Sequence, residues 1–392
     1  MKIFLFFTII GLILYFPIFY ADFAGDDASH FYIVKKNYSH NVLTPFDRVI
    51  GTQSNNRLLG YFYRPLPFII YSSFYYLGLP AFFYHLLQLF FYIAGTYLLY
   101  LFFSKFFSQR LSFLLSSIFL IHPANNDLAA YIAALDETLC LLFGLLVLLL
   151  IGPKRPSLLR LSTISAVMLF CFLSKETAVL FAAFGLFYIF SKKASWQYII
   201  AILVSAGIYL LFRVHAAYQP VFLLLKGRAA HFSAVEHLFL ALQIAFAFIK
   251  EIFIPTRSSI KPGVFDPTLR SSILPTIELL IFVLSCWALW IVLKSYSRKA
   301  SSIFLFFLFW IALGITLHTQ IIPLEVLFAD RWLYITEIGL LGAIGTIFTT
   351  IPLKRNRWFV IGTVLVGILL FLYCLETFIL NIKWHDWQRY FV

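Results

Sequence analysis

The chain has 392 residues, of which 62% are hydrophobic, 20% aromatic and 12% charged. A soluble domain carries about 25% charged residues, so this composition excludes a water-soluble globular protein and predicts one that uses the lipid bilayer as its solvent. The formal net charge of +13 does not indicate nucleic acid as a partner, because the basic residues stand in short clusters at the ends of apolar runs.

Apolar runs of membrane length recur from one end of the chain to the other. About 20 such residues cover the roughly 30 Å of hydrocarbon in a bilayer. We therefore predict an all-α integral membrane protein, a polytopic helical bundle of about 11 transmembrane helices with further helices in its external loops. The predicted spans are 3–20, 81–103, 111–121, 137–151, 161–173, 177–190, 197–214, 275–293, 303–321, 332–351 and 358–380.

Short loops rich in Lys and Arg set the predicted orientation, because such loops face the cytoplasm. The densest of them are 152–160, 294–302 and 352–357, which places the N-terminus inside and the C-terminus outside. Two more apolar stretches, 64–80 and 237–255, would break this alternation as full spans. We predict that both are helices in the outer interface.

These spans predict a single transmembrane domain, 1–392, with two long external regions. The first external loop, 21–63, carries an acid pair directly after the first span. The second external region, 215–275, carries the second interfacial helix. The four cysteines lie in apolar runs without CxxC spacing, which is typical of small buried residues rather than of disulfides or a metal site.

Ionisable residues that the loop charges do not explain collect on the predicted external side. Such groups near membrane depth are costly unless they are paired or hydrated, so by default they indicate a functional cavity. The residues are Asp26, Asp27, Arg64, His122, Asp127, Asp136, Glu137, Lys175, Glu176, Asp330 and Arg331.

This set of side chains suits one kind of group transfer. A carboxylate can act as general base on a hydroxyl, and Arg and Lys bind phosphate, Arg as a planar fork and Lys as a point charge. Asp26 and Asp27 would activate and orient an acceptor hydroxyl, while Arg64, Lys175 and Arg331 would stabilise a departing lipid phosphate. The reaction predicted is transfer from a lipid-linked phosphate donor to an acceptor hydroxyl.

Six short motifs in chain order resemble a known family. They are FAGDD (23–27), YRPL (63–66), HPANNDLAAY (122–131), LSKETAVL (173–180), ADRWLYITEIG (329–339) and NIKWHDWQRYF (381–391). Together they resemble the membrane domain of the GT-C glycosyltransferases, in particular the TMTC-like and protein O-mannosyltransferase-like proteins and their bacterial relatives. The sequence has no tetratricopeptide repeats, and Ala133, Ala134 and Leu135 stand where those relatives commonly carry Ser-Gly-Arg.

The resemblance implies a GT-C bundle and a sugar donor, of hexosyl or mannosyl type, linked to polyprenyl or dolichyl phosphate. Transfer would take place on the external or lumenal face with inversion at the anomeric carbon, and the acceptor would be a protein, lipid or glycan. Asp26 would be the base and Asp27 its orienting partner, while Arg331, Lys175 and Arg64 would hold the donor phosphate. Further candidates for the site are His122, Asp127, Glu137, Glu176 and Tyr334. No metal ligands are predicted, although the acid pair leaves open a weakly bound divalent cation.

Two other functions fit the same residues. A transporter or flippase of a lipid-linked or anionic solute would also place cations and carboxylates in a helical bundle, and a catalytically inactive GT-C-like partner is the third alternative. Purely structural roles remain open as well. Asp26 and Asp27 would then be solvated residues at the start of a loop, and His122 would be a structural histidine that hydrogen-bonds to the backbone. The predicted location is the bacterial cytoplasmic (inner) membrane, with the endoplasmic reticulum as the second choice. In either membrane the surrounding lipids would be partners of the protein.

Overall fold

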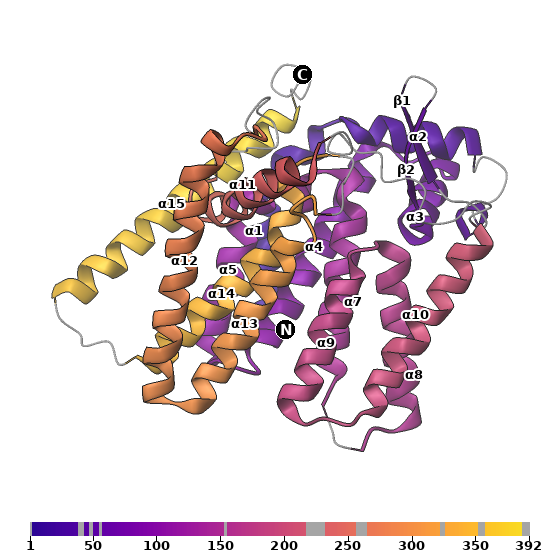
Figure 1. Ribbon diagram of the computed structural model, residues 1–392. Coiled ribbons are helices and arrows are strands. Elements are labelled where there is room, and N and C mark those ends of the chain that lie inside the picture. The colour runs from indigo at the N-terminus through magenta and orange to yellow at the C-terminus, as the bar shows by residue number, and fades with distance from the viewer. Residues whose placement is uncertain are drawn as a thin grey trace. The chain divides into compact units, whose positions relative to one another are not determined.

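A computed structural model describes residues 2–37, 43–46, 50–54, 57–152, 155–216, 232–255, 265–321, 326–351 and 357–385. The described chain is helical, as predicted, apart from one β-hairpin (Figure 1). The α-helices are α1 Lys2–Tyr15, α2 Asp26–Asn37, α3 Pro65–Tyr76, α4 Ala81–Phe103, α5 Gln109–Ile121, α6 Asn126–Ala130, α7 Leu135–Leu150, α8 Leu158–Ser174, α9 Ala178–Lys192, α10 Gln197–Ala216, α11 Ala234–Phe253, α12 Leu269–Tyr296, α13 Arg298–Thr316, α14 Leu333–Thr350 and α15 Arg357–His385. Short 3-10 turns at Phe16–Tyr20 (η1), Thr44–Phe46 (η2), Pro123–Asn125 (η3), Ile132–Ala134 (η4) and Asp330–Trp332 (η7) join them, and the strands are β1 Ile50–Ser54 and β2 Arg57–Phe62.

Eight helical segments within the described residues are long and apolar enough to cross a membrane. They are Lys2–Tyr20, Ala81–Phe103, Ile132–Leu150, Gln197–Ala216, Leu269–Tyr296, Arg298–Thr316, Asp330–Thr350 and Val360–Trp384. Three shorter apolar helices, α5, α8 and α9, occupy the other predicted spans. The 13 residues of α5 rise only about 20 Å at about 1.5 Å per residue. A multi-pass membrane protein is consistent with these helices, and the count of about 11 crossings stays a prediction.

The chain divides into two compact units, each described by itself below. The first unit contains residues 1–102, 126–224 and 380–392, and the second contains 103–125 and 225–379. The single domain expected from the sequence stays a prediction.

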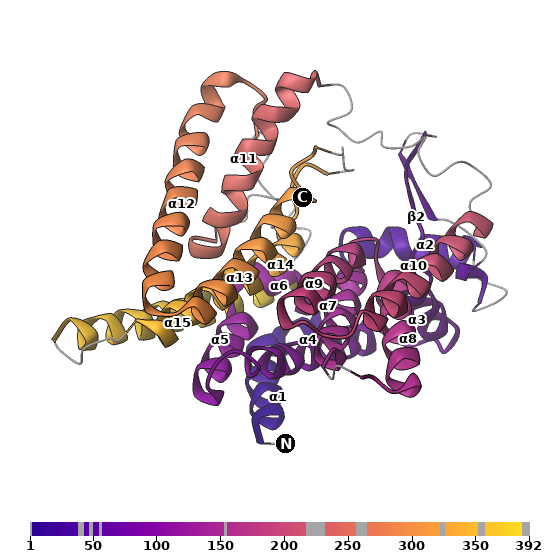
Figure 2. The same cartoon turned by 60° about the horizontal axis from the view of Figure 1, so that its bottom comes forward.

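Close helix packing at small residues organises each unit. In the first unit α7, α8 and α10 pack together (Figure 1), and Gly144 of α7 lets α9 approach so closely that a Cβ there would lie 2.2 Å from the Phe181 ring. In the second unit α13 packs along α14, where a Cβ on Gly342 would lie 2.2 Å from the Phe307 ring. Helix α11 lies alongside α12 in the same unit (Figure 2). Such contacts at glycine are the usual means by which membrane helices pack.

The two external regions predicted from the sequence contain more structure than loops. Region 21–63 holds helix α2 and the antiparallel hairpin β1–β2, in which Ile50 pairs with Phe62. The stretch 64–80 contains α3, and the stretch 237–255 lies within and just past α11, whose Ser233 and Glu236 form a capping box. Residues 217–231 and 256–264 of the second external region lie outside the described residues.

Candidate functional site

The two aspartates of the acid pair have different environments. Gly25, at a φ of 54°, turns the chain into α2, whose first two residues are Asp26 and Asp27. Asp27 is buried, and each of its carboxylate oxygens accepts a backbone N–H, from Ala24 at 3.0 Å and from Ala133 at 2.7 Å. The Asp26 side chain is exposed. Asp27 therefore fastens the start of α2 to η4, and Asp26 is the member of the pair that a substrate can reach.

A series of hydrogen bonds and one aromatic contact supports the first turn of α2, where the acid pair lies. The Asp26 N–H donates to the Tyr131 hydroxyl oxygen at 2.6 Å, and the Tyr131 ring packs on Trp384 with centroids 5.3 Å apart. The Trp384 indole N–H donates to Asn126 at 2.6 Å, and Asn126 donates to Asn381 at 2.5 Å. These residues come from three of the six motifs, 23–27, 122–131 and 381–391, and each of the residues named here lies in the first unit.

Three cations and three carboxylates form an ion network at the helix ends of the first unit. The Arg64 guanidinium contacts Asp136 at 2.5 Å and Glu176 at 2.7 Å. The Lys175 ammonium lies 3.2 Å from the same Asp136 oxygen and also pairs with Glu137. One oxygen of Asp136 is thus shared by two of the predicted phosphate-binding cations.

Local structure places these charges. Asp136 and Glu137 lie in the first turn of α7, and Lys175 is the C-cap of α8. Arg213, in the last turn of α10, reaches Glu176 at 3.5 Å and completes the network. Acids near helix N-termini and cations near C-termini are the arrangement that helix dipoles favour.

Burial makes this network different from a surface ion pair. The side chains of Glu137, Lys175 and Asp136 are 1%, 6% and 7% exposed. Burial raises the pKa of Glu176, but Arg64 and Arg213 outweigh it and the net pKa is lowered. Burial likewise opposes the charge of Arg64, yet Glu176 and Asp136 raise its pKa above the ordinary value. The formal charges of the three cations and the three carboxylates cancel, so the network has no net formal charge at these helix ends.

Tyr71 links the acid pair to the ion network. Its hydroxyl donates to the carbonyl oxygen of Ile132 at 2.6 Å, in the same short turn η4 whose Ala133 N–H binds Asp27. Burial raises the pKa of Tyr71 well above its ordinary value, and the negative charges of Asp136 and Asp27 add to this effect. Helix α2 packs on α3 and on η4, and α3 packs on α7 and α8. The two groups therefore share one neighbourhood.

Three predicted site residues, His122, Arg331 and Tyr334, belong to the second unit. His122 is buried, accepts the Ala124 N–H on Nδ1 at 3.2 Å and so donates from Nε2 to the Ile252 carbonyl at 2.7 Å. Burial lowers its pKa to about 4, partly offset by the Ile252 carbonyl. A neutral histidine with both nitrogens bonded to backbone has a structural role, which is the alternative that the sequence left open for it.

The remaining predicted residues are placed as follows. Arg331 is half-buried in η7 between the buried Asp330 and Trp332, and Tyr334 is fully buried at the start of α14. In the first unit, Asp127 is buried in the short helix α6. The structure thus brings together Asp26, Asp27, Arg64, Glu137, Lys175 and Glu176 around η4 and the start of α7.

Sequence reasoning assigned no role to four residues that build the site. The sequence indicates Asp136 as an external acid but does not indicate its partner, and Arg213 falls within the predicted span 197–214. The sequence does contain a signal that Arg213 has a function, because an Arg at the predicted external end of an apolar stretch is contrary to the positive-inside rule. Tyr71 has no sequence signal, since tyrosine is common in membrane interfaces, whereas Tyr131 is the last residue of the motif 122–131.

No cluster that could hold a metal ion is present among the described residues, counting groups of three or more His, Cys, Asp and Glu side chains. The weak divalent cation considered for the acid pair stays a prediction. No protein-family model and no curated protein matches this sequence. The resemblance to GT-C glycosyltransferases therefore rests on the six motifs alone.

Proposed function

We propose that this protein is a membrane glycosyltransferase of the GT-C type, which transfers a sugar from a polyprenyl- or dolichyl-phosphate-linked donor to an acceptor hydroxyl on the non-cytoplasmic face. The observation that carries the proposal is the shared neighbourhood of an exposed carboxylate and two cations, Lys175, which is buried, and Arg64, which is half-buried. Asp26 begins α2, Asp27 fixes that helix to η4, and Arg64 and Lys175 meet at Asp136 just beyond the same turn.

Asp26 is assigned as the general base. Its side chain is exposed, whereas both oxygens of Asp27 accept backbone N–H groups. Because both of its oxygens already bind the backbone, Asp27 is not placed to take a proton from an acceptor hydroxyl. Asp27 is therefore a positioning residue, which holds Asp26 in place by fixing the first turn of α2.

Arg64 and Lys175 are assigned to the donor phosphate. Buried cations are costly to leave unpaired, and the carboxylates of Asp136, Glu137 and Glu176 meet that requirement in the structure without substrate. A phosphate that enters would compete for the position of the shared Asp136 oxygen. The proposal uses residues of the first unit only, and Arg331 stays a candidate in the second unit.

The proposed reaction is a single displacement. The Asp26 carboxylate takes the proton of the acceptor hydroxyl, and the acceptor oxygen forms a bond to the anomeric carbon. The bond between that carbon and the phosphate oxygen breaks at the same time, so the lipid phosphate leaves with the electron pair and the configuration inverts. Arg64 and Lys175 stabilise the charge that develops on the leaving phosphate.

The helices support a location in a membrane. Eight apolar helical segments support a multi-pass membrane protein, with the bacterial cytoplasmic membrane as the first candidate and the endoplasmic reticulum as the second. The donor tail would lie in the bilayer between helices while the headgroup reaches the external ends of α3, α7 and α8. The acceptor, whether protein, lipid or glycan, would approach from the water side at Asp26.

Transfer assays with charge-neutral variants test the assignment. Membranes with equal amounts of wild type, Asp26→Asn and Asp22→Asn would be assayed with polyprenyl-phosphate donors of several sugars. Asp22 is the matched control, because it is exposed and, among the described residues, its side chain accepts only the neighbouring Phe23 N–H at 2.8 Å. We expect Asp26→Asn to lose transfer by about 10²-fold or more, as for removal of a general base, while Asp22→Asn stays near wild type. An equal loss of transfer in both variants, or no loss in either variant, contradicts the proposal.

Transport is the second candidate, and one observation in the second unit favours it. Glu337 of α14 is fully buried, and its carboxylate accepts the Asn125 side-chain N–H at 2.6 Å. An ionisable residue inside a membrane-length helix often marks an ion or proton pathway, and the proposed sugar transfer does not use this one. Uptake of an anionic solute by proteoliposomes that depends on Glu337, without any sugar transfer, would favour transport. A protein that does neither would fit the inactive GT-C-like partner.

A further inference from the structure

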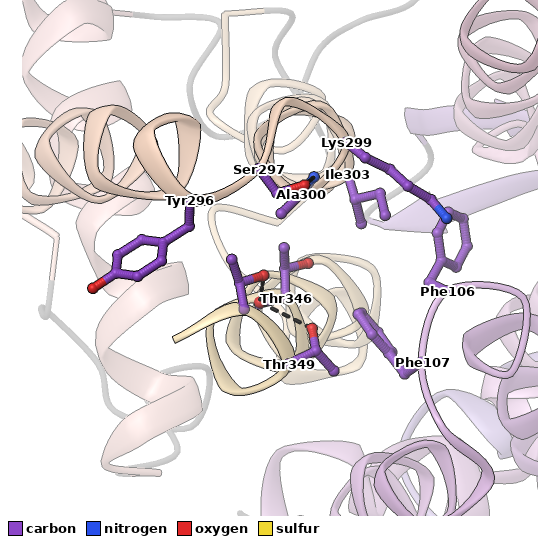
Figure 3. Close-up of a pocket in the computed structure, with 10 residues that line it drawn as sticks. Phe106, Phe107, Tyr296, Ser297, Lys299, Ala300, Ile303, Thr346 and Thr349 are labelled. Carbon is purple, nitrogen blue, oxygen red and sulfur yellow. Dashed lines mark hydrogen bonds between the residues drawn. The ribbon is translucent and has the colours of Figure 1, made fainter. Parts of the chain in front are cut away.

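A partly open cavity of about 390 Å³ lies in the second unit where α13 begins and α14 ends (Figure 3). Its lining comes from the junction of α12 and α13, from the first turns of α13, from the last turns of α14 and from the segment before α5: Phe106, Phe107, Tyr296, Ser297, Lys299, Ala300, Ile303, Thr346, Thr349 and Thr350. Ligand pockets span about 300–1,000 Å³, so the cavity has room for a small polar headgroup. It plays no part in the function proposed above.

One side of the cavity can bind an anion. Lys299 is exposed, and it forms no ion pair with any residue that the structure describes. In Figure 3 its side chain extends toward the ring of Phe106. The Ser297 oxygen accepts the Ala300 N–H at 3.3 Å, so its hydroxyl hydrogen remains a donor. An ammonium beside a hydroxyl donor suits a phosphate oxygen.

The other side offers hydrogen-bond acceptors. Thr346 donates its single hydroxyl hydrogen to the Gly342 carbonyl at 2.9 Å, Thr349 to Gly345 at 3.0 Å, and Thr350 to Thr346 at 2.7 Å. Each hydroxyl therefore has only lone pairs to present to a ligand. The last turn of α14 adds carbonyl oxygens without partners in the helix and the negative end of its dipole. This side favours a cation that carries N–H donors.

The position of the cavity indicates where its ligand comes from. Helices α13 and α14 are both long and apolar enough to span a membrane, so their ends lie near a membrane surface. This end carries Lys294, Arg298 and Lys299, which the positive-inside rule predicts to face the cytoplasm. Phe106, Phe107 and Ile303 add apolar surface beside the polar groups. A lipid headgroup at the cytoplasmic surface fits this setting.

We infer that this cavity binds the phosphoethanolamine headgroup of a phospholipid in the cytoplasmic leaflet, with the phosphate on Lys299 and Ser297 and the primary ammonium on the threonine oxygens. A choline headgroup has the same charges but no N–H to donate, so it leaves the threonine lone pairs without partners. The cavity should therefore discriminate between the two headgroups, unlike a surface that only attracts charge.

Binding to the full-length protein in detergent would be measured by native mass spectrometry. The probes are short-chain phosphatidylethanolamine, phosphatidylcholine and phosphatidylglycerol with identical chains, and free phosphoethanolamine. We expect phosphatidylethanolamine to bind about tenfold more tightly than phosphatidylcholine, and Lys299→Gln to weaken it about tenfold, as for loss of a charge-assisted hydrogen bond. Arg298→Gln is the matched control, since it changes the same charge one residue away but does not line the cavity.

Thr349→Val provides a second variant that leaves every charge in place. We expect it to reduce the preference for ethanolamine over choline without weakening the binding of phosphatidylcholine. Equal binding of both lipids by wild type would overturn the inference, as would equal effects of Lys299→Gln and Arg298→Gln. Phosphatidylglycerol binding as tightly as phosphatidylethanolamine would assign the cavity to anionic headgroups instead. Free phosphoethanolamine binding as tightly as the lipid would assign it to a soluble ligand.

Discussion

Replacing Lys175 by Met tests whether the ion network of the first unit is a buried structure. The substitution keeps the length of the side chain and removes its ammonium. Glu137, which pairs with Lys175 and is 1% exposed, then has to remain charged without that partner or take up a proton. Asp136 and Glu176 keep the guanidinium of Arg64, so the loss concentrates on Glu137.

The expected magnitude follows from burial. An exposed ion pair contributes about 0–1 kcal/mol, but removal of one partner from a buried pair costs about 3–5 kcal/mol. A separate route gives a similar figure, because keeping an ordinary glutamate with a pKa of about 4.3 protonated at pH 7 costs about 1.4 kcal/mol for each of about 2.7 pH units, or about 3.7 kcal/mol. By this route the cost shrinks to about 1 kcal/mol at pH 5.

The assay is the free energy of unfolding in mixed detergent micelles at pH 7 and pH 5. Lys35→Met is the control, because Lys35 is exposed on α2 and its replacement should change stability by no more than about 0.5 kcal/mol. Adding Glu137→Gln to Lys175→Met should recover most of the loss at pH 7. A loss below 1 kcal/mol at pH 7, or no recovery in the double variant, would refute the reasoning from burial.

Three further predictions concern other parts of the chain. His122 has a pKa lowered to about 4 from an ordinary 6.5, so the unfolded state binds its proton first and stability falls as pH drops from 6.5 to 4. The loss is on the order of 3 kcal/mol for about 2.5 pH units, and a His122→Gln variant with an unchanged pH profile contradicts it. Glu176 has a lowered pKa, so its contribution is present above 4.5, its ordinary value, and is lost as pH falls through the lower folded value. Glu176→Gln should remove that acid sensitivity. Gly342→Ala should destabilise the protein by about 1–3 kcal/mol, because its Cβ would lie 2.2 Å from Phe307. Gly362→Ala, with nothing within 4 Å, should not, and equal thermal stabilities of the two variants would count against the close packing of α13 and α14.

The sequence predicted the helices wherever apolar runs were long, because a segment in lipid has to satisfy its backbone N–H and C=O groups internally, as a helix does. It did not predict α2, whose residues Asp26 to Asn37 include two acids and two lysines and show no continuous apolar face. That helix forms for tertiary reasons. Gly25 supplies the left-handed turn before it, and Asp27 anchors its first turn to η4. Neither feature has a periodic pattern that a sequence could show.

The sequence also predicted that external cations matter but not how they are neutralised. Arg64 binds Asp136, 72 residues away, and Glu176, 112 residues away. No local spacing rule connects partners that meet only when α3, α7 and α8 pack together. Lys175 and Glu176 are adjacent in the sequence, yet in the structure Lys175 pairs with Glu137 and Glu176 pairs with Arg64. Adjacent residues at the end of a helix point in different directions, which favours partners on other helices.

The neutral network also bears on how such a site could work. An anion that binds Arg64 or Lys175 has to displace the carboxylates that already pair with them. In the proposed function, a lipid phosphate would have to replace the shared Asp136 oxygen between Arg64 and Lys175. Asp136→Asn should therefore bind anions less selectively. It keeps the shape of the side chain but removes the charge that competes with phosphate, so inorganic phosphate should inhibit sugar transfer by this variant at lower concentration than by wild type. Unchanged inhibition would mean that Asp136 does not compete with phosphate, and that the network only stabilises the packing of α3 against α7 and α8.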